Sequence, residues 1–136
     1  MEEFNPIISE QVILVVDDSN ITRNLIEHIF KDKYKVVMAN NGQGAIDTVD
    51  VMKDSIVAIL LDLNMPEVNG FDVLDYFKMN GILEKKPVCV VTGEDAPEII
   101  GKVKSYPVSA ILLKPFSAEQ IKTVVSKAIE LKEAKN

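Results

Sequence analysis

Four of the five apolar runs in the sequence are followed directly by side chains of the kinds found in catalytic and metal-binding sites. In chain order, these side chains are Asp17, Asp18, Asp62, Thr92 and Lys114. Three carboxylates that lie close together repel one another, which raises their pKa values unless a cation lies between them. Oxygen donors without soft ligands are the donor set that Mg²⁺ prefers. If these residues meet, the sequence predicts a Mg²⁺ site.

A bound Mg²⁺ and a lysine together make a positively charged pocket that fits a phosphoryl group. A carboxylate beside such a metal can also be the nucleophile and form an aspartyl-phosphate. In that chemistry Thr92 would donate a hydrogen bond to a phosphoryl oxygen, while Lys114 would supply the positive charge. The residue types therefore indicate phosphoryl chemistry on a carboxylate.

The apolar runs that precede these side chains are short and continuous rather than alternating in polarity. They cover residues 12–16, 36–39, 56–61, 88–91 and 110–113. Strands buried on both faces, as in a parallel sheet covered by helices, have this pattern. Such sheets bind ligands at the carboxyl ends of their strands, which is where the polar side chains stand.

Segments with a helical period lie between the apolar runs. In the first of these segments, one face is expected to be formed by Ile21, Leu25, Ile29 and Phe30. Helix starts are expected at Ser19 or Asn20, at Asn69-Gly70, at Pro97, and at a capping box of Ser117 with Gln120. Five strands and five helices in strict alternation predict a doubly wound α/β fold, a five-stranded parallel sheet with helices on both faces.

Length and composition fit one compact domain. The 136 residues divide into a short N-terminal extension (1–10), the domain (11–131) and a polar tail (132–136) that is expected to fray. A net charge of −6 argues against direct nucleic-acid binding. Cys89 and His28 are single, which excludes a disulfide and a cysteine-based zinc cage. Neither a signal peptide nor a run of the ~20 apolar residues of a membrane span is present, so a cytoplasmic protein without membrane contact is expected.

Four motifs resemble the signature positions of two-component response regulator receiver domains, the CheY-like family. They lie at residues 15–19 (VVDDS), 60–66 (LLDLNMP), 90–93 (VVTG) and 113–116 (LKPF). Their spacings agree as well: 45 positions from Asp17 to Asp62, 30 from Asp62 to Thr92 and 22 from Thr92 to Lys114. The resemblance covers residues 11–131 and implies a flavodoxin-like strand order of 2-1-3-4-5.

The resemblance also implies a role for each acidic position. Asp62 would accept the phosphoryl group from a phosphohistidine. Asp18 and Asp62 would ligate Mg²⁺, or Mn²⁺ in its place, directly. Asp17 would act mostly through water, and Asn64 would offer its backbone carbonyl to the metal.

Further positions would control the switch and its lifetime. Lys114 would pair with the phosphoryl oxygens and, in the resting state, with Asp62. Thr92 would move to hydrogen-bond the phosphoryl group, and the side chains of Asn64 and Glu94 would tune water access and the rate of hydrolysis. Ile111 departs from the family, which usually has Tyr or Phe three residues before the lysine and uses that ring to couple phosphorylation to the output surface.

The implied function is a signalling switch that catalyses its own phosphorylation and slow dephosphorylation, rather than a turnover enzyme. Its partners would be a sensor histidine kinase or a histidine phosphotransfer protein and a downstream protein that the sequence does not name. The chain would be a monomer or a weak phosphorylation-dependent dimer. Tyr106, near the end of the fourth predicted helix, is an alternative reporter ring in place of Ile111.

Three other functions compete with this interpretation. A pseudo-receiver would bind a partner without phosphorylation, an alternative that Ile111 keeps open. A Mg²⁺-dependent phosphatase with an aspartate nucleophile needs a second acid two residues further on, where this chain has Asn64. A flavin binder would have a Ser/Thr-rich phosphate loop where this chain has Asp17 and Asp18.

Overall fold

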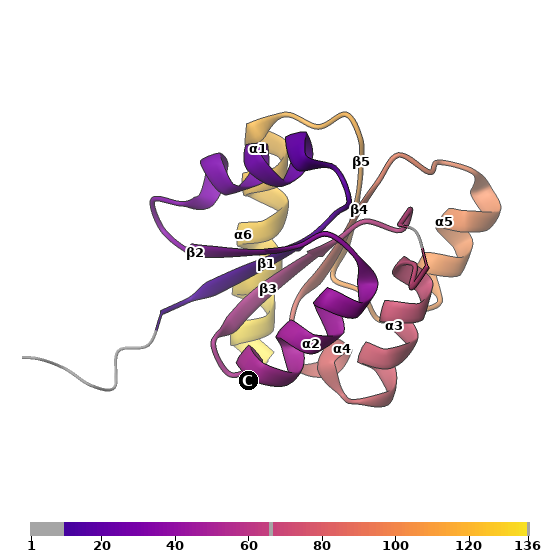
Figure 1. The fold of residues 1–136 in the computed structure, drawn as a ribbon, viewed down its shortest axis with the longest axis horizontal. Helices are drawn as coiled ribbons and strands as arrows, with labels where there is room; N and C mark the ends of the chain where they lie inside the picture. Colours follow the sequence, from indigo (N-terminus) through magenta and orange to yellow (C-terminus); the bar gives the residue numbers. More distant parts are fainter. Residues whose placement is uncertain (1–9, 66, 136) are drawn as a thin grey trace, which may run out of the picture.

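The computed structural model describes residues 10–65 and 67–135, and within them a five-stranded parallel sheet forms the centre of the molecule (Figure 1). The strands are β1 (Val12–Val16), β2 (Lys35–Ala39), β3 (Ile56–Leu61), β4 (Val88–Thr92) and β5 (Ala110–Leu113). Their order is β2-β1-β3-β4-β5, and every neighbouring pair is parallel. The doubly wound α/β fold and its strand order are confirmed. Residues 1–9 of the expected N-terminal extension lie outside the described residues.

Burial explains why the central strands are continuous apolar runs. Every residue of β1 and of β4 is buried, and in β3 only Val57 is partly exposed. A strand covered by helices on both faces has no polar side to present to water. β2 lies at the edge of the sheet, and there Met38 is exposed.

Helices cover both faces of the sheet (Figure 1). They are α1 (Asn20–Phe30), α2 (Gly42–Met52), α3 (Gly70–Met79), α4 (Ile82–Lys85), α5 (Pro97–Lys104) and α6 (Ala118–Lys135). Buried side chains of α2, α3, α4 and α5 share one core cluster, and those of α1 and α6 share the other. The sheet is thus the middle of three layers.

The predicted helix starts are confirmed. The Ser19 side chain caps α1 by accepting a hydrogen bond from Thr22 N at 3.2 Å. Asn69 caps α3, and Pro97 begins α5. Ser117 and Gln120 form a reciprocal capping box ahead of α6, with distances of 2.7 and 3.0 Å.

Two expectations about the helices were wrong. Ile21 and Leu25 do not share the buried face of α1, because Ile21 is 82% and Leu25 45% exposed while Ile26 and Phe30 are buried. Ile26 and Phe30 are one turn apart and lie on the opposite side of the helix from Ile21. The expected five helices also become six within the described residues. The extra helix is α4, a single turn that places Ile82 and Leu83 in the core after Gly81 adopts a left-handed conformation (φ 74°).

The last helix is longer than expected. Residues 132–136 were expected to be a polar tail that frays; α6 continues through them as far as Lys135, and Asn136 lies outside the described residues. Lys, Glu and Ala are good helix formers. Lys132 also anchors the segment, because its Nζ donates to Leu83 O at 3.2 Å. None of the helices in the described residues has the length and apolar character needed to cross a membrane.

Candidate phosphoryl-transfer site

Three carboxylates meet at the carboxyl edge of the sheet. Asp17 and Asp18 follow β1, and Asp62 follows the neighbouring strand β3. Each residue offers a carboxylate oxygen, and the three oxygens lie within 4.8 Å of one another. Asp17 and Asp62 are buried, whereas Asp18 is exposed. The cluster therefore consists of two carboxylates at the base and one at the solvent side, all of them hard oxygen donors suited to Mg²⁺.

Gly70 allows α3 to approach the carboxyl edge of the sheet closely. A Cβ atom on Gly70 would lie only 2.5 Å from Leu63 Cα and 2.7 Å from the Asp62 carbonyl oxygen. Any larger residue would push the start of α3 away from the backbone that carries Asp62. The residue at the start of α3 thus contributes to the placement of Asp62.

Lys114 reaches the acidic cluster from the end of β5. Its Nζ lies 2.8 Å from Asp17 Oδ2 and 3.5 Å from Asp62 Oδ2. The resemblance implied a resting pair with Asp62, and the structure has that contact together with a shorter one to Asp17. The ammonium group therefore bridges the two buried carboxylates and offsets their repulsion.

The same contacts shift the pKa values of the groups that make them. Burial raises the pKa of Asp62, and the nearby charge of Asp17 raises it further, although Lys114 opposes both effects. Burial alone would lower the pKa of the Lys114 ammonium, but its hydrogen bond to Asp17 and the two carboxylate charges bring that pKa above its ordinary value. Lys114 thus stays a cation, as a partner for phosphoryl oxygens must.

Thr92 is the last residue of β4 and is completely buried. Its Oγ1 accepts a hydrogen bond from Glu94 N at 3.0 Å. A hydroxyl that accepts from the backbone keeps its own proton for a second partner. The side chain is therefore able to donate a hydrogen bond at the carboxyl edge of the sheet.

Asn64 and Glu94 connect the loops that follow β3 and β4. Asn64 Nδ2 donates to Glu94 Oε1 at 2.9 Å, and Asn64 N donates to Asp62 Oδ1 at 3.3 Å. The two residues expected to tune water access therefore contact each other directly. No feature of the sequence indicated that hydrogen bond, because the two positions are 30 residues apart.

The profile of the response regulator receiver domain matches residues 13–126 of this chain. The chain belongs to the response regulator receiver family. The match includes both acidic motifs, Thr92 and Lys114, so the whole cluster lies inside the receiver domain. Receiver domains in general bind Mg²⁺ at an acidic pocket, and this one has such a cluster of carboxylates.

Curated relatives are response regulators of plants and bacteria. The two-component response regulator ORR3 of Oryza sativa subsp. indica is 27% identical over 121 residues, which cover 88% of this chain and 92% of the rice protein. Sporulation initiation phosphotransferase F of Bacillus subtilis is 31% identical, covering 88% and 94%. The two-component response regulator ORR7 of Oryza sativa subsp. japonica is 27% identical, but this chain spans only 56% of its length.

Solved structures agree with the fold of the receiver domain. The signal receiver domain of a putative LuxO repressor from Vibrio parahaemolyticus superposes with a TM-score of 0.85 at 26% identity, covering 93% of this chain and 95% of that one. The chemotaxis protein CheY4 of Vibrio cholerae has a TM-score of 0.78 at 27% identity, covering 88% and 99%.

The expected switch position lies beside the core rather than at the acidic cluster. Ile111 is partly buried in β5 and packs against the core that β1 and β3 share with α2, α3, α4 and α5. The alternative reporter, Tyr106, contacts α3: its hydroxyl donates to Asp75 Oδ1 at 2.6 Å, and its ring lies 6.2 Å from that of Phe71. Burial and the hydrogen bond to Asp75 raise the pKa of Tyr106 to about 12.

Sequence reasoning did not include Arg23 in the site, although the structure places it there. Its Nη1 donates to the Asp17 carbonyl oxygen at 2.7 Å, and its Nη2 donates to Asn20 Oδ1. The available signal was that Arg23 is the one arginine of the chain and stands five residues after Asp18.

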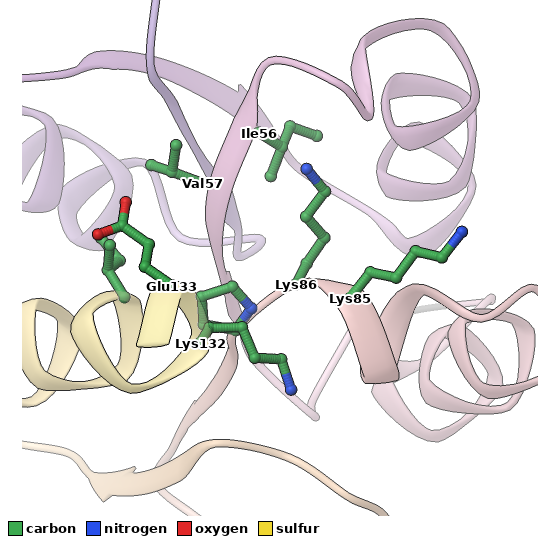
Figure 2. A pocket seen from close by; sticks show the side chains of 8 residues that line it. Ile56, Val57, Lys85, Lys86, Lys132 and Glu133 are labelled. Atoms are coloured by element: carbon green, nitrogen blue, oxygen red, sulfur yellow. The ribbon is translucent and has the colours of Figure 1, made fainter. Parts of the chain in front are cut away.

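A separate hollow of about 120 Å³ lies at the opposite edge of the sheet (Figure 2). It is lined where β3 and β4 begin, by Ile56 and Pro87, and by the second half of α6. Lys85, Lys86 and Lys132 stand around it, but Figure 2 shows their ammonium groups pointing in different directions. The hollow therefore lacks the convergent donors of an anion site and is remote from the carboxylates.

Proposed function

We propose that the chain accepts a phosphoryl group on Asp62 in a Mg²⁺-dependent reaction, and that this modification changes a protein-binding surface. The observation that carries the proposal is the position of Lys114, whose ammonium group bridges Asp17 and Asp62. A cation held at the base of an acidic cluster supports a negatively charged phosphoryl group there. Thr92, buried at the end of the neighbouring strand, supplies a hydrogen-bond donor.

The transfer uses Asp62 as the nucleophile. A carboxylate oxygen of Asp62 forms a bond to phosphorus, the bond between phosphorus and the donor's imidazole nitrogen breaks, and the imidazole leaves with the electron pair and takes up a proton. Lys114 then pairs with an oxygen of the phosphoryl group. Thr92 turns its hydroxyl proton toward another oxygen.

The three acidic residues have different roles in the proposed metal binding. Both carboxylate oxygens of Asp17 already accept hydrogen bonds, Oδ1 from Ser19 N at 2.9 Å and Oδ2 from Lys114 at 2.8 Å, which favours a contact through water. Asp18 is exposed and would serve as a direct ligand together with Asp62 and the backbone carbonyl of Asn64. When bound, Mg²⁺ or Mn²⁺ neutralises charge on the phosphoryl oxygens.

The hydrogen bond between Asn64 and Glu94 controls the lifetime of the phosphorylated state. It joins the two loops beside Asp62, so these side chains restrict the approach of a hydrolytic water. Autodephosphorylation is accordingly slow, and the protein acts as a switch rather than as a turnover enzyme.

The phosphoryl donor is a sensor histidine kinase or a histidine phosphotransfer protein. Membership of the receiver family and the similarity to a protein named sporulation initiation phosphotransferase support a phosphorelay role. The receiver acts in the cytoplasm, as a monomer or a weak phosphorylation-dependent dimer, on a downstream protein rather than on nucleic acid or a membrane.

A second candidate is a pseudo-receiver that binds its partner without phosphorylation. The observation that favours it is Ile111, an aliphatic side chain without a ring or hydroxyl at the position where the family usually has an aromatic switch. The Mg²⁺-dependent phosphatase has no comparable support, since Asn64 is not an acid and lies hydrogen-bonded to Glu94.

Intact-mass analysis after incubation with acetyl phosphate tests the proposal, using the wild type and Asp62→Asn, each with and without Mg²⁺. We expect one added phosphoryl group (about 80 Da) in the wild type with Mg²⁺ only, and none in Asp62→Asn, because an amide cannot form the acyl phosphate. An adduct at unchanged stoichiometry in Asp62→Asn would mean that another residue is the acceptor. No adduct in the wild type, with acetyl phosphate or with BeF₃⁻ as its mimic, would favour the pseudo-receiver.

A further inference from the structure

Arg23 is the single arginine of a chain with 15 basic residues, and its side chain turns back toward the acidic cluster. It lies in the first turn of α1, four residues after the N-cap Ser19. From there Nη1 donates to the carbonyl oxygen of Asp17 at 2.7 Å, and Nη2 donates to Asn20 Oδ1. One guanidinium group thus joins the start of α1 to the backbone of the loop after β1.

A cation at this position works against the helix dipole. The N-terminus of a helix carries a partial positive charge, which disfavours lysine or arginine in the first turn. The hydrogen bonds to the Asp17 carbonyl and to Asn20 Oδ1 offset that cost. A guanidinium group has five donors in a planar fork and can serve two acceptors at once, which one ammonium group does less well.

The hydrogen bond from Arg23 to Asp17 does not use a carboxylate oxygen. Lys114 binds Asp17 and Asp62 through their side-chain oxygens, whereas Arg23 binds Asp17 only through its main-chain carbonyl. Asp17 is therefore held at three atoms: Oδ1 by Ser19 N, Oδ2 by Lys114 and the carbonyl by Arg23. The next residue along the chain is Asp18, the exposed carboxylate of the cluster.

We infer that Arg23 is a positioning residue for divalent-cation binding, holding the loop after β1 so that Asp18 and Asp62 present their oxygens to one ion. This inference rests on the proposed function, because it assigns Arg23 to the same metal site. Outer contacts that orient metal ligands affect metal affinity by about 10–100-fold when they are removed.

A purely electrostatic role and a positioning role of Arg23 predict opposite changes in Mg²⁺ affinity when its side chain is removed. Removing a positive charge near a Mg²⁺ site reduces repulsion and should tighten binding. Removing the guanidinium group of Arg23 releases the loop after β1 and should weaken Mg²⁺ binding. The sign of the change in Mg²⁺ affinity therefore separates a positioning role from a purely electrostatic one.

The test is a Mg²⁺ titration followed by NMR, repeated with Mn²⁺ followed by EPR, on the wild type, Arg23→Gln and Arg23→Lys. We expect the dissociation constant to rise about tenfold in Arg23→Gln. In Arg23→Lys we expect a similar rise, because the charge is kept and the fork is lost. Unchanged or tighter binding in Arg23→Gln would overturn the inference, and wild-type affinity in Arg23→Lys would overturn the role of the fork.

Two further variants control for charge and test the second acceptor of Arg23. Lys31→Gln makes the same charge change at the exposed C-cap of α1 and should leave Mg²⁺ affinity unchanged or slightly tighter. Asn20→Ala removes one acceptor of the fork without any charge change and should weaken binding in the same direction as Arg23→Gln, by a smaller factor. Wild-type affinity in Asn20→Ala would count against a two-acceptor fork.

Phosphorylation kinetics give a readout that a general folding defect would not. With acetyl phosphate, Arg23→Gln should raise the Mg²⁺ concentration for half-maximal rate about tenfold while the rate at saturating Mg²⁺ stays within about twofold of the wild type. Equal losses at all Mg²⁺ concentrations would indicate structural damage and refute the positioning role. A wild type that binds no Mg²⁺ would refute the proposed function itself, which is a different outcome from a wild type and an Arg23→Gln that bind equally well.

Discussion

The adjacent aspartates Asp17 and Asp18 have different surroundings, which favours different roles in the proposed metal binding. Asp17 is buried, and all three of its oxygens accept hydrogen bonds from Ser19, Lys114 and Arg23. Asp18 is exposed, and its carboxylate lies in the acidic cluster. A metal that keeps several waters needs only one or two carboxylates bound directly. The exposed residue is the one able to turn toward an incoming ion without breaking existing contacts.

Substitution of Asp18 by alanine should therefore weaken Mg²⁺ binding by about tenfold or more, since a direct ligand is lost. The measurement is a Mg²⁺ titration by isothermal calorimetry. Asp32→Ala is the matched control, because Asp32 is also exposed and gives the same change of net charge away from the cluster. An identical titration for Asp18→Ala and the wild type would exclude Asp18 as a ligand.

At the scale of elements, the sequence predicted what depends on short segments and missed what depends on packing. The strands were predictable because a parallel sheet requires continuous apolar runs, and Asp62 and Lys114 were predictable as neighbours because the carboxyl ends of the strands meet at one edge. The buried face of α1 was not predictable, since two stripes were available and only packing against α6 and the sheet selects Ile26 and Phe30.

The direction in which a long side chain extends also cannot be predicted from the sequence. Arg23 lies close to Asp17 because its side chain turns backward over the first turn of α1, and nothing in the local pattern requires that direction. The hydrogen bond between Asn64 and Glu94 depends in the same way on how two loops meet. The meeting of the carboxylates with Lys114 was thus predictable from residue types and strand ends, whereas the supporting contacts required coordinates.

Two tyrosine–aspartate hydrogen bonds tie α3 to its neighbours. Tyr106, between α5 and β5, donates to Asp75 on α3 at 2.6 Å, and Tyr76 on α3 donates to Asp50 on α2 at 2.8 Å. Since the Tyr106 bond joins α3 to the segment after α5, its loss should loosen the helix that follows Thr92. We expect Tyr106→Phe to lower the free energy of unfolding by about 0.5–1 kcal/mol at pH 8.

The pH dependence of the stability lost in Tyr106→Phe tests whether the hydrogen bond to Asp75 causes that loss. The pKa of Tyr106 is raised from 10.0 to about 12 in the folded protein, so the folded state binds this proton more tightly than the unfolded state does. The stabilisation is therefore complete below pH 10 and disappears as the pH rises from 10 through about 12. Urea unfolding at pH 8 and pH 11.5 should show the difference in free energy of unfolding between wild type and Tyr106→Phe narrowing at the higher pH. A difference that does not change with pH would contradict this assignment.

For the molecule as a whole, the proposed phosphoryl site and the expected switch position lie in different parts of one sheet. The carboxylates, Thr92 and Lys114 gather at the carboxyl edge, whereas Ile111 lies within β5 and packs against the core on the α2–α5 side. The proposed phosphorylation uses only side chains at the carboxyl edge of the sheet. In the proposed switch, transmission of the signal needs the layer of helices to respond, and Ile111 offers that layer an aliphatic side chain without a ring.

This separation predicts that Ile111→Tyr will leave phosphorylation nearly intact. The rate of phosphorylation by acetyl phosphate, followed by intact mass at saturating Mg²⁺, should stay within about twofold of the wild type, because no group that touches the phosphoryl site is changed. Inserting a larger ring beside the core should cost about 1–3 kcal/mol of stability, so a thermal melt must accompany the assay. Ile111→Phe, which adds the ring without the hydroxyl, distinguishes the cost of volume from any effect of a new hydrogen bond. A large loss of rate in Ile111→Tyr with the melt preserved, and not in Ile111→Phe, would show that the hydroxyl reaches the site and that chemistry and switching cannot be separated along β5.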